Sequence, residues 1–232
     1  MEASTSWGVI MSKWKAAQNI ALYVVNEDNS IKLFPVSTRA RKESKNASYD
    51  VKASEEYVVQ QKKIVKLPPY SIAVGAPEKI NYAFNTRSCA INGLWSGDLL
   101  NVGPNIGGRG KDGSIPLGDW LYHFPAQLIP TLSKDQTCQF IKYRLEGSPE
   151  FHFSVNKLSL SVIADTSMMN KIKFIYRVLD NPEKLASISF ALPESDKLTL
   201  SSSAGGISKN KLTVDVSTKS EFVVEMAWQG DK

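Results

Sequence analysis

The side chains best suited to bind a ligand are concentrated in one stretch of the chain, from Trp95 to Phe124. Aromatic rings stack on the apolar faces of sugars, while carboxylate and guanidinium groups hydrogen-bond to hydroxyls. The members of this stretch that could act in this way are Trp95, Asp98, Arg109, Asp119, Trp120, Tyr122 and His123. The competing interpretation is that the tryptophans are core side chains that hold the stretch against the rest of the fold.

The same stretch offers less for catalysis. Asp98 paired with Asp112 or Asp119 has the residue types for acid–base work on a sugar, although aspartates also cap turns. Ser96 is not part of a Gly-x-Ser-x-Gly elbow, and the chain has only two histidines, so a nucleophilic triad is not predicted. No catalytic residue is assigned, and the sequence leaves open whether the protein is an enzyme.

The glycine-rich segment 101–113 does not match a cofactor-binding loop. A Walker-type phosphate loop ends in Gly-Lys-Ser/Thr, whereas Gly110-Lys111-Asp112 lacks the hydroxyl residue. A dinucleotide fingerprint needs a helix after the glycines, and none is expected here. Gly103-Pro104-Asn105-Ile106 followed by Gly-Arg resembles the haem-lining loop of c-type cytochromes, but the Cys-x-x-Cys-His attachment motif does not occur. We therefore predict no cofactor.

The two cysteines, Cys89 and Cys138, are too few for a disulfide framework. They could form one bridge in an oxidising compartment or remain two buried thiols, and the sequence leaves both open. Together with His123 and His152 they supply metal-binding atoms, but without a CxxC or HxxxH spacing that would preorganise a site. No metal site is predicted.

Charge points to no particular class of partner. The chain has 28 Lys and Arg against 23 Asp and Glu, a formal net charge of +5. The densest basic groups, at 39–45 and 62–66, are interpreted as solvated faces, the alternative being a phosphate- or sulfate-binding patch. Because the bases are spread along the chain, a nucleic-acid partner is not predicted. No apolar run reaches the roughly 18 residues that a membrane span needs.

Short apolar runs separated by turn residues predict an all-β protein. Ile172, Phe174 and Tyr176 alternate with Lys173 and Arg177, as expected for an antiparallel sheet with one face in the core and one in water. The predicted fold is a large, supersandwich-like antiparallel β-sandwich. Strands are expected at 20–25, 30–36, 56–67, 70–74, 80–84, 90–95, 140–145, 151–155, 158–164, 171–179, 188–192, 198–202, 211–216 and 221–228.

The segment from Ser96 to Pro130 interrupts this pattern because it is rich in Gly and Pro. Its aromatic residues would be unusual in a disordered linker, so we predict a long, ordered but irregular Gly/aromatic loop packed on the sandwich. Helices are expected only at Ser12–Gln18 and, more weakly, at Pro182–Leu185.

The polar, charged segment 37–51 divides the chain. We predict an N-terminal extension or small element over 1–50 and a β-sandwich domain over 51–232. The N-terminus carries Glu2, Lys13 and Lys15, which do not fit a signal peptide, so the chain is expected to be either cytosolic or a mature fragment whose leader was removed.

Three motifs, taken in order, resemble a known module. The sequences are IAVGAPEKINYAFN at 72–85, LWSGDLL at 94–100, and GRG at 108–110 with PLG at 116–118. They resemble an uncharacterised β-rich module of secreted bacterial proteins, found beside c-type cytochrome and sorbosone/glucose-dehydrogenase-like domains. Asn85 and Leu100 depart from this pattern, which has Asp at or near these positions. The resemblance implies a periplasmic or extracellular location and a redox-associated, sugar-oxidising neighbourhood.

These observations together predict a non-enzymatic secreted or periplasmic binding module, which recognises a carbohydrate or a partner protein through residues 95–124. One alternative is a docking or accessory subunit of a redox enzyme, with a cytochrome or dehydrogenase as its partner. Another is a carbohydrate-active enzyme that uses Asp98 and Asp119.

Overall fold

The computed structural model describes residues 20–25, 31–36 and 48–229, the first two ranges as backbone strands only. These two strands, β1 (Ile20–Val25) and β2 (Ile31–Val36), pair with each other in antiparallel register. The predicted helix at Ser12–Gln18 lies outside the described residues. The second predicted helix is wrong, because residues 182–185 form a turn.

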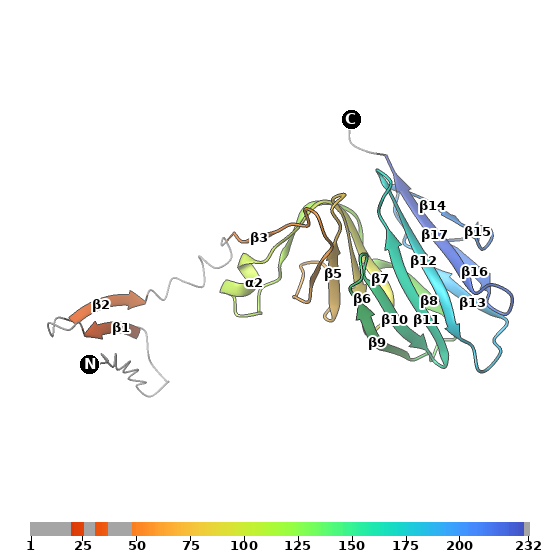
Figure 1. The fold of residues 1–232 in the computed structure, drawn as a ribbon, viewed down its shortest axis with the longest axis horizontal. Coiled ribbons are helices and arrows are strands. Elements are labelled where there is room, and N and C mark those ends of the chain that lie inside the picture. The colour runs from red at the N-terminus through yellow and green to blue at the C-terminus, as the bar shows by residue number, and fades with distance from the viewer. Residues whose placement is uncertain (1–19, 26–30, 37–47, 230–232) are drawn as a thin grey trace.

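Residues 48–229 form a β-sandwich of two antiparallel sheets, as predicted (Figure 1). One sheet has six strands, in the order β14 (Leu198–Ser202), β17 (Glu221–Trp228), β12 (Lys171–Asp180), β11 (Leu158–Asp165), β10 (Glu150–Val155) and β9 (Cys138–Arg144). The other has nine, in the order β15 (Ile207–Ser208), β16 (Lys211–Asp215), β13 (Ser187–Ala191), β8 (Ile115–Thr131), β7 (Ala90–Asn101), β6 (Ile80–Asn85), β5 (Ser71–Gly75) and β4 (Val58–Gln60), with β3 (Asp50–Val51) paired to β7.

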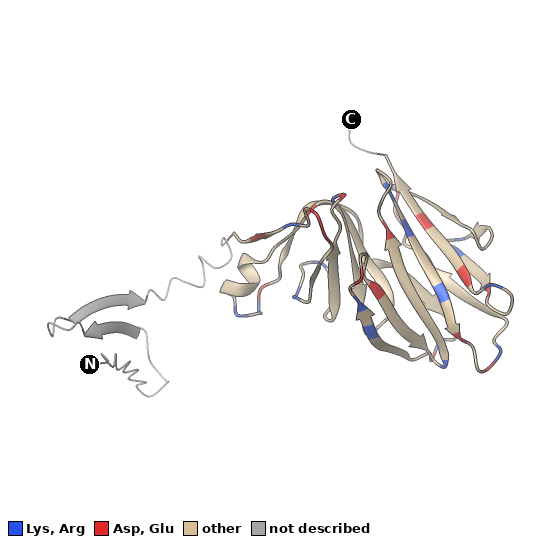
Figure 2. Cartoon of the chain, in the orientation of Figure 1, with Lys and Arg blue, Asp and Glu red and all other residues tan. Residues whose placement is uncertain are grey.

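The alternation in the sequence sets which face of each strand is buried. In β12, the side chains of Ile172, Phe174 and Tyr176 are buried, and the residues between them are more exposed. β12 and β17 carry charges of both signs (Figure 2), at positions that are more exposed than the buried ones between them. Arg177 and Glu221, for example, lie opposite each other in the register and form an ion pair of 2.8 Å. Burying one face and solvating the other is the ordinary solution for an antiparallel sheet.

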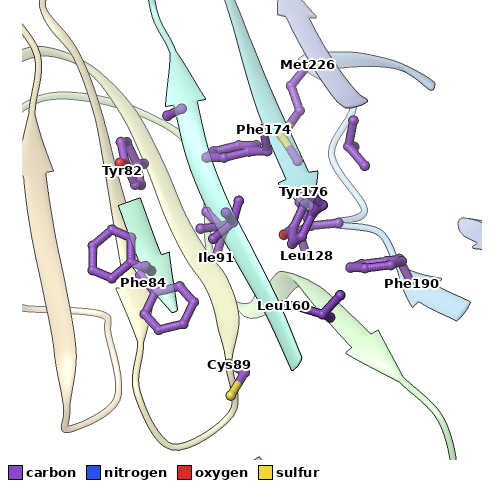
Figure 3. Close-up of a cluster of buried hydrophobic side chains, with 14 of the residues drawn as sticks. Tyr82, Phe84, Cys89, Ile91, Leu128, Leu160, Phe174, Tyr176, Phe190 and Met226 are labelled. Atoms are coloured by element: carbon purple, nitrogen blue, oxygen red, sulfur yellow. The ribbon is translucent and has the colours of Figure 1, made fainter. Parts of the chain in front are cut away.

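The main core fills the space between the two sheets (Figure 3). Phe84 of the nine-stranded sheet stacks on Phe151 of the six-stranded sheet, with ring centroids 4.6 Å apart. Further along, Phe190 packs against Tyr176 and Phe222 at 4.9 and 5.3 Å. Such aromatic pairs stabilise the fold by more than the burial of each ring from water alone. These contacts therefore fix how the two sheets face each other.

A disulfide between Cys89 and Cys138 joins the two sheets at one end of this core. Cys89 lies in the turn between β6 and β7, and Cys138 opens β9. The bridge therefore links the β6–β7 turn of one sheet to a strand of the other, and the two cysteines are 49 residues apart in the chain. The sequence left a bridge and two free thiols as alternatives, and the structure has the bridge.

The prediction of an irregular loop from Ser96 to Pro130 is wrong in its conformation. The segment is ordered, but most of it belongs to the two longest strands of the nine-stranded sheet, β7 and β8. Only the tip between these strands departs from the sheet, with the short helix α2 (Gly103–Gly107). The physical reason is that most of β8 has a partner strand on one side only, since β13 pairs only with its last three residues. Proline is tolerated at such unpaired edges.

A second, smaller core lies on the outer face of the nine-stranded sheet. It surrounds Trp95, which is fully buried and donates its indole N–H to the carbonyl oxygens of Asp98 and Leu99 at 3.3 and 3.1 Å. Its other members are Ile64, Ala73, Ala83, Leu99, Leu100 and Val102. Two parts of the chain therefore cover this face of the sheet: the segment after β4, and the hairpin that joins β7 to β8. The sheet is buried on both sides here.

Candidate functional site

The first wall of the candidate site is formed where β7 and β8 approach each other closely. Gly97 of β7 lies opposite Gly118 of β8, and Gly97 has a φ of +108°, which favours glycine. A side chain on Gly118 would collide with the carbonyl oxygen of Ser96, and one on Gly97 would lie 2.7 Å from the carbonyl oxygen of Leu117. The glycines thus allow an approach that places Ser96 and Asp119 side by side in the register.

The connection between β13 and β14 forms a second wall beside these residues. The Ser195 hydroxyl donates to the Leu121 carbonyl oxygen at 2.8 Å, and the Lys197 ammonium donates to the Trp120 carbonyl oxygen at 3.1 Å. The Ser195 oxygen also accepts the backbone N–H of Lys197 at 3.3 Å. These bonds fasten the connection to β8, so the wall is part of the folded structure and does not depend on a ligand.

The six-stranded sheet supplies the third wall. The backbone N–H of Trp228, at the end of β17, donates to the Asn170 carbonyl oxygen at 3.0 Å, which fixes the main chain at this half-buried residue beside the turn before β12. Between the three walls lies a cleft of about 560 Å³, which we call the polar cleft. It is lined by Ser96, Asp119, Leu121, Asn170, Asp196, Lys197, Leu198, Thr199, Ala227, Trp228 and Gln229.

The polar cleft offers both hydrogen-bond acceptors and donors. The carboxylates of Asp119 and Asp196 accept hydrogen bonds, the Lys197 ammonium donates, and the Asn170 amide does both. Trp228 adds an aromatic surface. This is the residue chemistry that the sequence predicted for a sugar site, but it is assembled mostly from other residues.

The structure does not bring the seven predicted site residues onto one surface. Asp119 lines the polar cleft, whereas Trp95 is buried in the outer core and Tyr122 is buried in the main core. The Tyr122 hydroxyl donates to the Ile91 carbonyl oxygen at 3.3 Å, so it has a structural role. Arg109 is exposed on the hairpin tip just after α2.

Trp120 and His123 lie together on the outer side of the nine-stranded sheet. Trp120 packs on Trp95 with ring centroids 5.1 Å apart, and the His123 ring meets its edge at 5.3 Å. The His123 Nδ1 lies 2.8 Å from the Phe124 carbonyl oxygen. Both side chains are half-buried, and neither lines the polar cleft.

Asp98 is held by two lysines. Its carboxylate forms ion pairs with Lys52 at 2.6 Å and with Lys79 at 3.7 Å. The hydrogen bond from Lys52 lowers the pKa of Asp98 below its usual range. Asp98 is not among the residues of the polar cleft, so the two carboxylates that share this cleft are Asp119 and Asp196 rather than Asp98 and Asp119.

Comparison with known protein families, curated proteins and solved structures finds no match to this chain. The function is therefore inferred from the site itself. Within residues 48–229, no three His, Cys, Asp or Glu side chains are grouped so that they could hold a metal ion. In the same part of the chain, no helix has the length and apolar character needed to cross a membrane.

Sequence reasoning missed most of the polar cleft. Asp196, Lys197 and Trp228 lie far from Trp95–Phe124 in the chain, and only the pairing of β14 with β17 brings them together. The one available signal was the pair of Ser-Gly and Gly-Asp dipeptides at 96–97 and 118–119. Glycines inside two strands mark a close backbone approach, and a polar residue beside each is then positioned by that approach.

Proposed function

We propose that this protein is a non-enzymatic binding module that holds a carbohydrate in the polar cleft. The observation that carries the proposal is the composition of this cleft, in which two carboxylates, an ammonium, two amides and an indole surround one preformed space. Its volume of about 560 Å³ lies within the range of sites that bind small molecules.

Sugar hydroxyls both donate and accept hydrogen bonds, so they suit a site that presents both kinds of partner. Asp119 and Asp196 would accept from hydroxyls, while Lys197 and Asn170 would donate to them. The indole of Trp228 would contact an apolar sugar face. Because the walls are already fixed by Ser195, Lys197 and Trp228, little ordering entropy is lost on binding, which favours affinity.

The proposal is tested by calorimetric titration of the protein with a panel of neutral oligosaccharides. We expect binding by at least one glycan, and a loss of about tenfold or more in affinity for Asp119→Asn and for Asp196→Asn, because a hydrogen bond to a charged group is worth about 1.5–3 kcal/mol. Asp135→Asn, an exposed change in the turn before β9, is the matched control. If no glycan binds, or if the cleft variants bind as well as the control, the proposal is wrong.

We further propose a secreted or periplasmic location. The Cys89–Cys138 bridge supports it, because disulfides persist in oxidising compartments and are rare where glutathione keeps thiols reduced. Alkylation of the protein in native cells, followed by mass mapping, should find both cysteines protected. Alkylated Cys89 and Cys138 in freshly lysed cells would contradict this location.

A further inference from the structure

A second hollow lies at the other end of the sandwich. It has a volume of about 490 Å³ and lies where the edge of one sheet meets the edge of the other. We call it the edge groove. It is lined by Gln61, Lys62, Lys63, Pro68, Pro69, Tyr70, Ser71, Ile72, Thr86 and Phe140. Five of these side chains are apolar or aromatic, and none is a carboxylate.

The apolar floor of the edge groove is preformed. The Ser71 hydroxyl donates to the Pro68 carbonyl oxygen, and the Asn85 amide donates to that of Pro69, both at 2.9 Å. Tyr70 follows with a φ of +69°, a conformation that a bulky residue adopts only when its surroundings enforce it. Tyr70 is 55% exposed, and the Arg87 guanidinium lies 3.8 Å from the centroid of its ring. A rigid aromatic surface therefore remains in contact with solvent.

An edge strand borders the edge groove. β9 is the last strand of the six-stranded sheet and pairs with β10 on one side. It contributes Phe140 to the groove, and Gln61 reaches it by donating to the Tyr143 hydroxyl at 2.9 Å. Ile141 of β9 is 53% exposed. An edge strand of this length with an exposed apolar residue is a natural template for an added strand.

The charged residues that line the edge groove and those of β9 itself are all basic. Lys62 and Lys63 lie in its lining, and exposed Lys142 and Arg144 follow along β9, which carries blue segments in Figure 2. Within the described part of the chain, none of these four cations forms an ion pair with a carboxylate. Lys63 donates to the Lys111 carbonyl oxygen at 2.7 Å, whereas Lys62, Lys142 and Arg144 are available to meet acidic groups on another molecule.

From these features we propose that the edge groove and β9 bind an extended acidic peptide segment of a partner protein. The segment adds to β9 as a further strand, which supplies backbone hydrogen bonds. Its side chains alternate, so apolar residues on one face enter the groove while acidic residues on the other meet the exposed Lys142 and Arg144 of β9. This site is separate from the polar cleft and does not depend on the function proposed for it.

The test uses a fluorescently labelled peptide of about eight residues, the length of an ordinary strand, with alternating Glu and Val. Binding to the full chain is followed by fluorescence anisotropy. We expect saturable binding that weakens as the ionic strength rises toward about 1 M, where charges are screened beyond about 3 Å. A peptide of equal length with alternating Lys and Val should not bind. N-methylation of alternate amides of the acidic peptide should abolish binding, because it removes the strand pairing.

Two double variants locate the site. Lys142→Glu with Arg144→Glu should weaken binding of the acidic peptide by about tenfold or more, because like charges then face each other along β9. Lys209→Glu with Lys211→Glu makes the same change in net charge at the β15–β16 edge of the nine-stranded sheet and should leave the affinity within about twofold of wild type. Asp119→Asn should also have no effect.

Three results would overturn the proposal. They are no binding of the acidic peptide, equal binding of the acidic and basic peptides, and equal affinity in the two double variants. A sulfated glycan such as a heparin fragment is titrated in parallel. If it binds the groove and the acidic peptide does not, the lysines recognise a sulfated chain and the strand-addition proposal is wrong.

Discussion

The polar cleft and the edge groove lie at opposite ends of β6 and are built in different ways. At one end of this strand Ile80 lies opposite Ser96 of the polar cleft, and at the other Asn85 lies opposite Ser71 of the edge groove. The polar cleft owes its shape to a close approach between β7 and β8. The edge groove owes its shape to a proline-rich floor and to the edges of two sheets near a disulfide.

This difference shows how one sandwich can present two unlike binding surfaces. A hollow between the inner faces of the sheets carries polar side chains where the apolar core ends. A hollow at the sheet edges instead combines exposed apolar side chains with unpaired backbone groups, which suit a peptide better than a sugar. Because separate features support the two sites, separate substitutions should damage them.

The largest effect is expected for Trp95→Ala, which empties the centre of the outer core. Truncating a fully buried tryptophan costs about 3–5 kcal/mol of unfolding free energy, and this indole also loses two hydrogen bonds. Trp120→Ala, in the neighbouring half-buried ring, should cost clearly less. Urea denaturation measures both. If the two variants are equally stable, Trp95 is not the anchor of this face.

The second-largest loss of stability is expected when the disulfide is removed. This change should affect the edge groove more than the polar cleft. A bridge between residues 49 apart restricts the unfolded chain, so Cys89→Ala with Cys138→Ala should cost roughly 2–5 kcal/mol. Because Cys138 opens β9, we also expect weaker binding of the acidic peptide in this double variant. Glycan binding at the polar cleft should be retained below the unfolding transition. Loss of glycan binding with intact peptide binding would contradict the separation of the two sites.

A smaller but more local effect is expected for Gly118→Ala. The added methyl group would collide with the Ser96 carbonyl oxygen, so β7 and β8 must separate, at a cost of about 1–3 kcal/mol. The affinity for the glycan should also fall in this variant, because Ser96 and Asp119 move. Peptide binding at the edge groove should not change. Gly206→Ala is the matched control, because nothing lies within 4 Å of a side chain there. Equal stability of the two variants would show that the close approach is not required.

The smallest effect concerns pH and lies outside both sites. Lys52 lowers the pKa of Asp98 in the folded protein, so this carboxylate stabilises the fold above the pKa of about 3.9 that it has when unfolded. That contribution is lost as the pH falls through the lowered pKa. Asp98→Asn and Lys52→Met should therefore both reduce the loss of stability between pH 7 and pH 3, measured by urea denaturation at each pH. An unchanged loss in both variants would contradict this assignment.

The strands could be predicted from the sequence because their signal is local. Alternating side chains in stretches such as 171–178 define both the strand and its buried face, and β12, β16 and β17 match the predicted ranges closely. β8 could not be predicted in this way. Its Pro116, Gly118 and Pro125 are strand breakers in isolation, and they are tolerated because β13 does not pair with this part of β8.

The site was harder to predict because strand alternation separates neighbours in sequence. Trp95 and Ser96 are adjacent, yet one is buried on the outer side of the sheet and the other lines the polar cleft on the inner side. Residue type alone therefore grouped Trp95, Trp120 and Tyr122, which the fold distributes over two faces. Most of the residues that line the polar cleft with Asp119 lie about 50 to 110 positions later in the chain.

The central claim is that the polar cleft is the ligand site, and chemical-shift mapping tests it most directly. Isotope-labelled protein is titrated with the glycan that binds best in the calorimetric panel, and backbone amide shifts are followed. We expect the shifts to concentrate at Ser96, Asp119, Asn170, Asp196–Thr199 and Trp228. Shifts that instead concentrate at the edge groove or around Trp120 and His123, with none at Asp119 and Asp196, would contradict it.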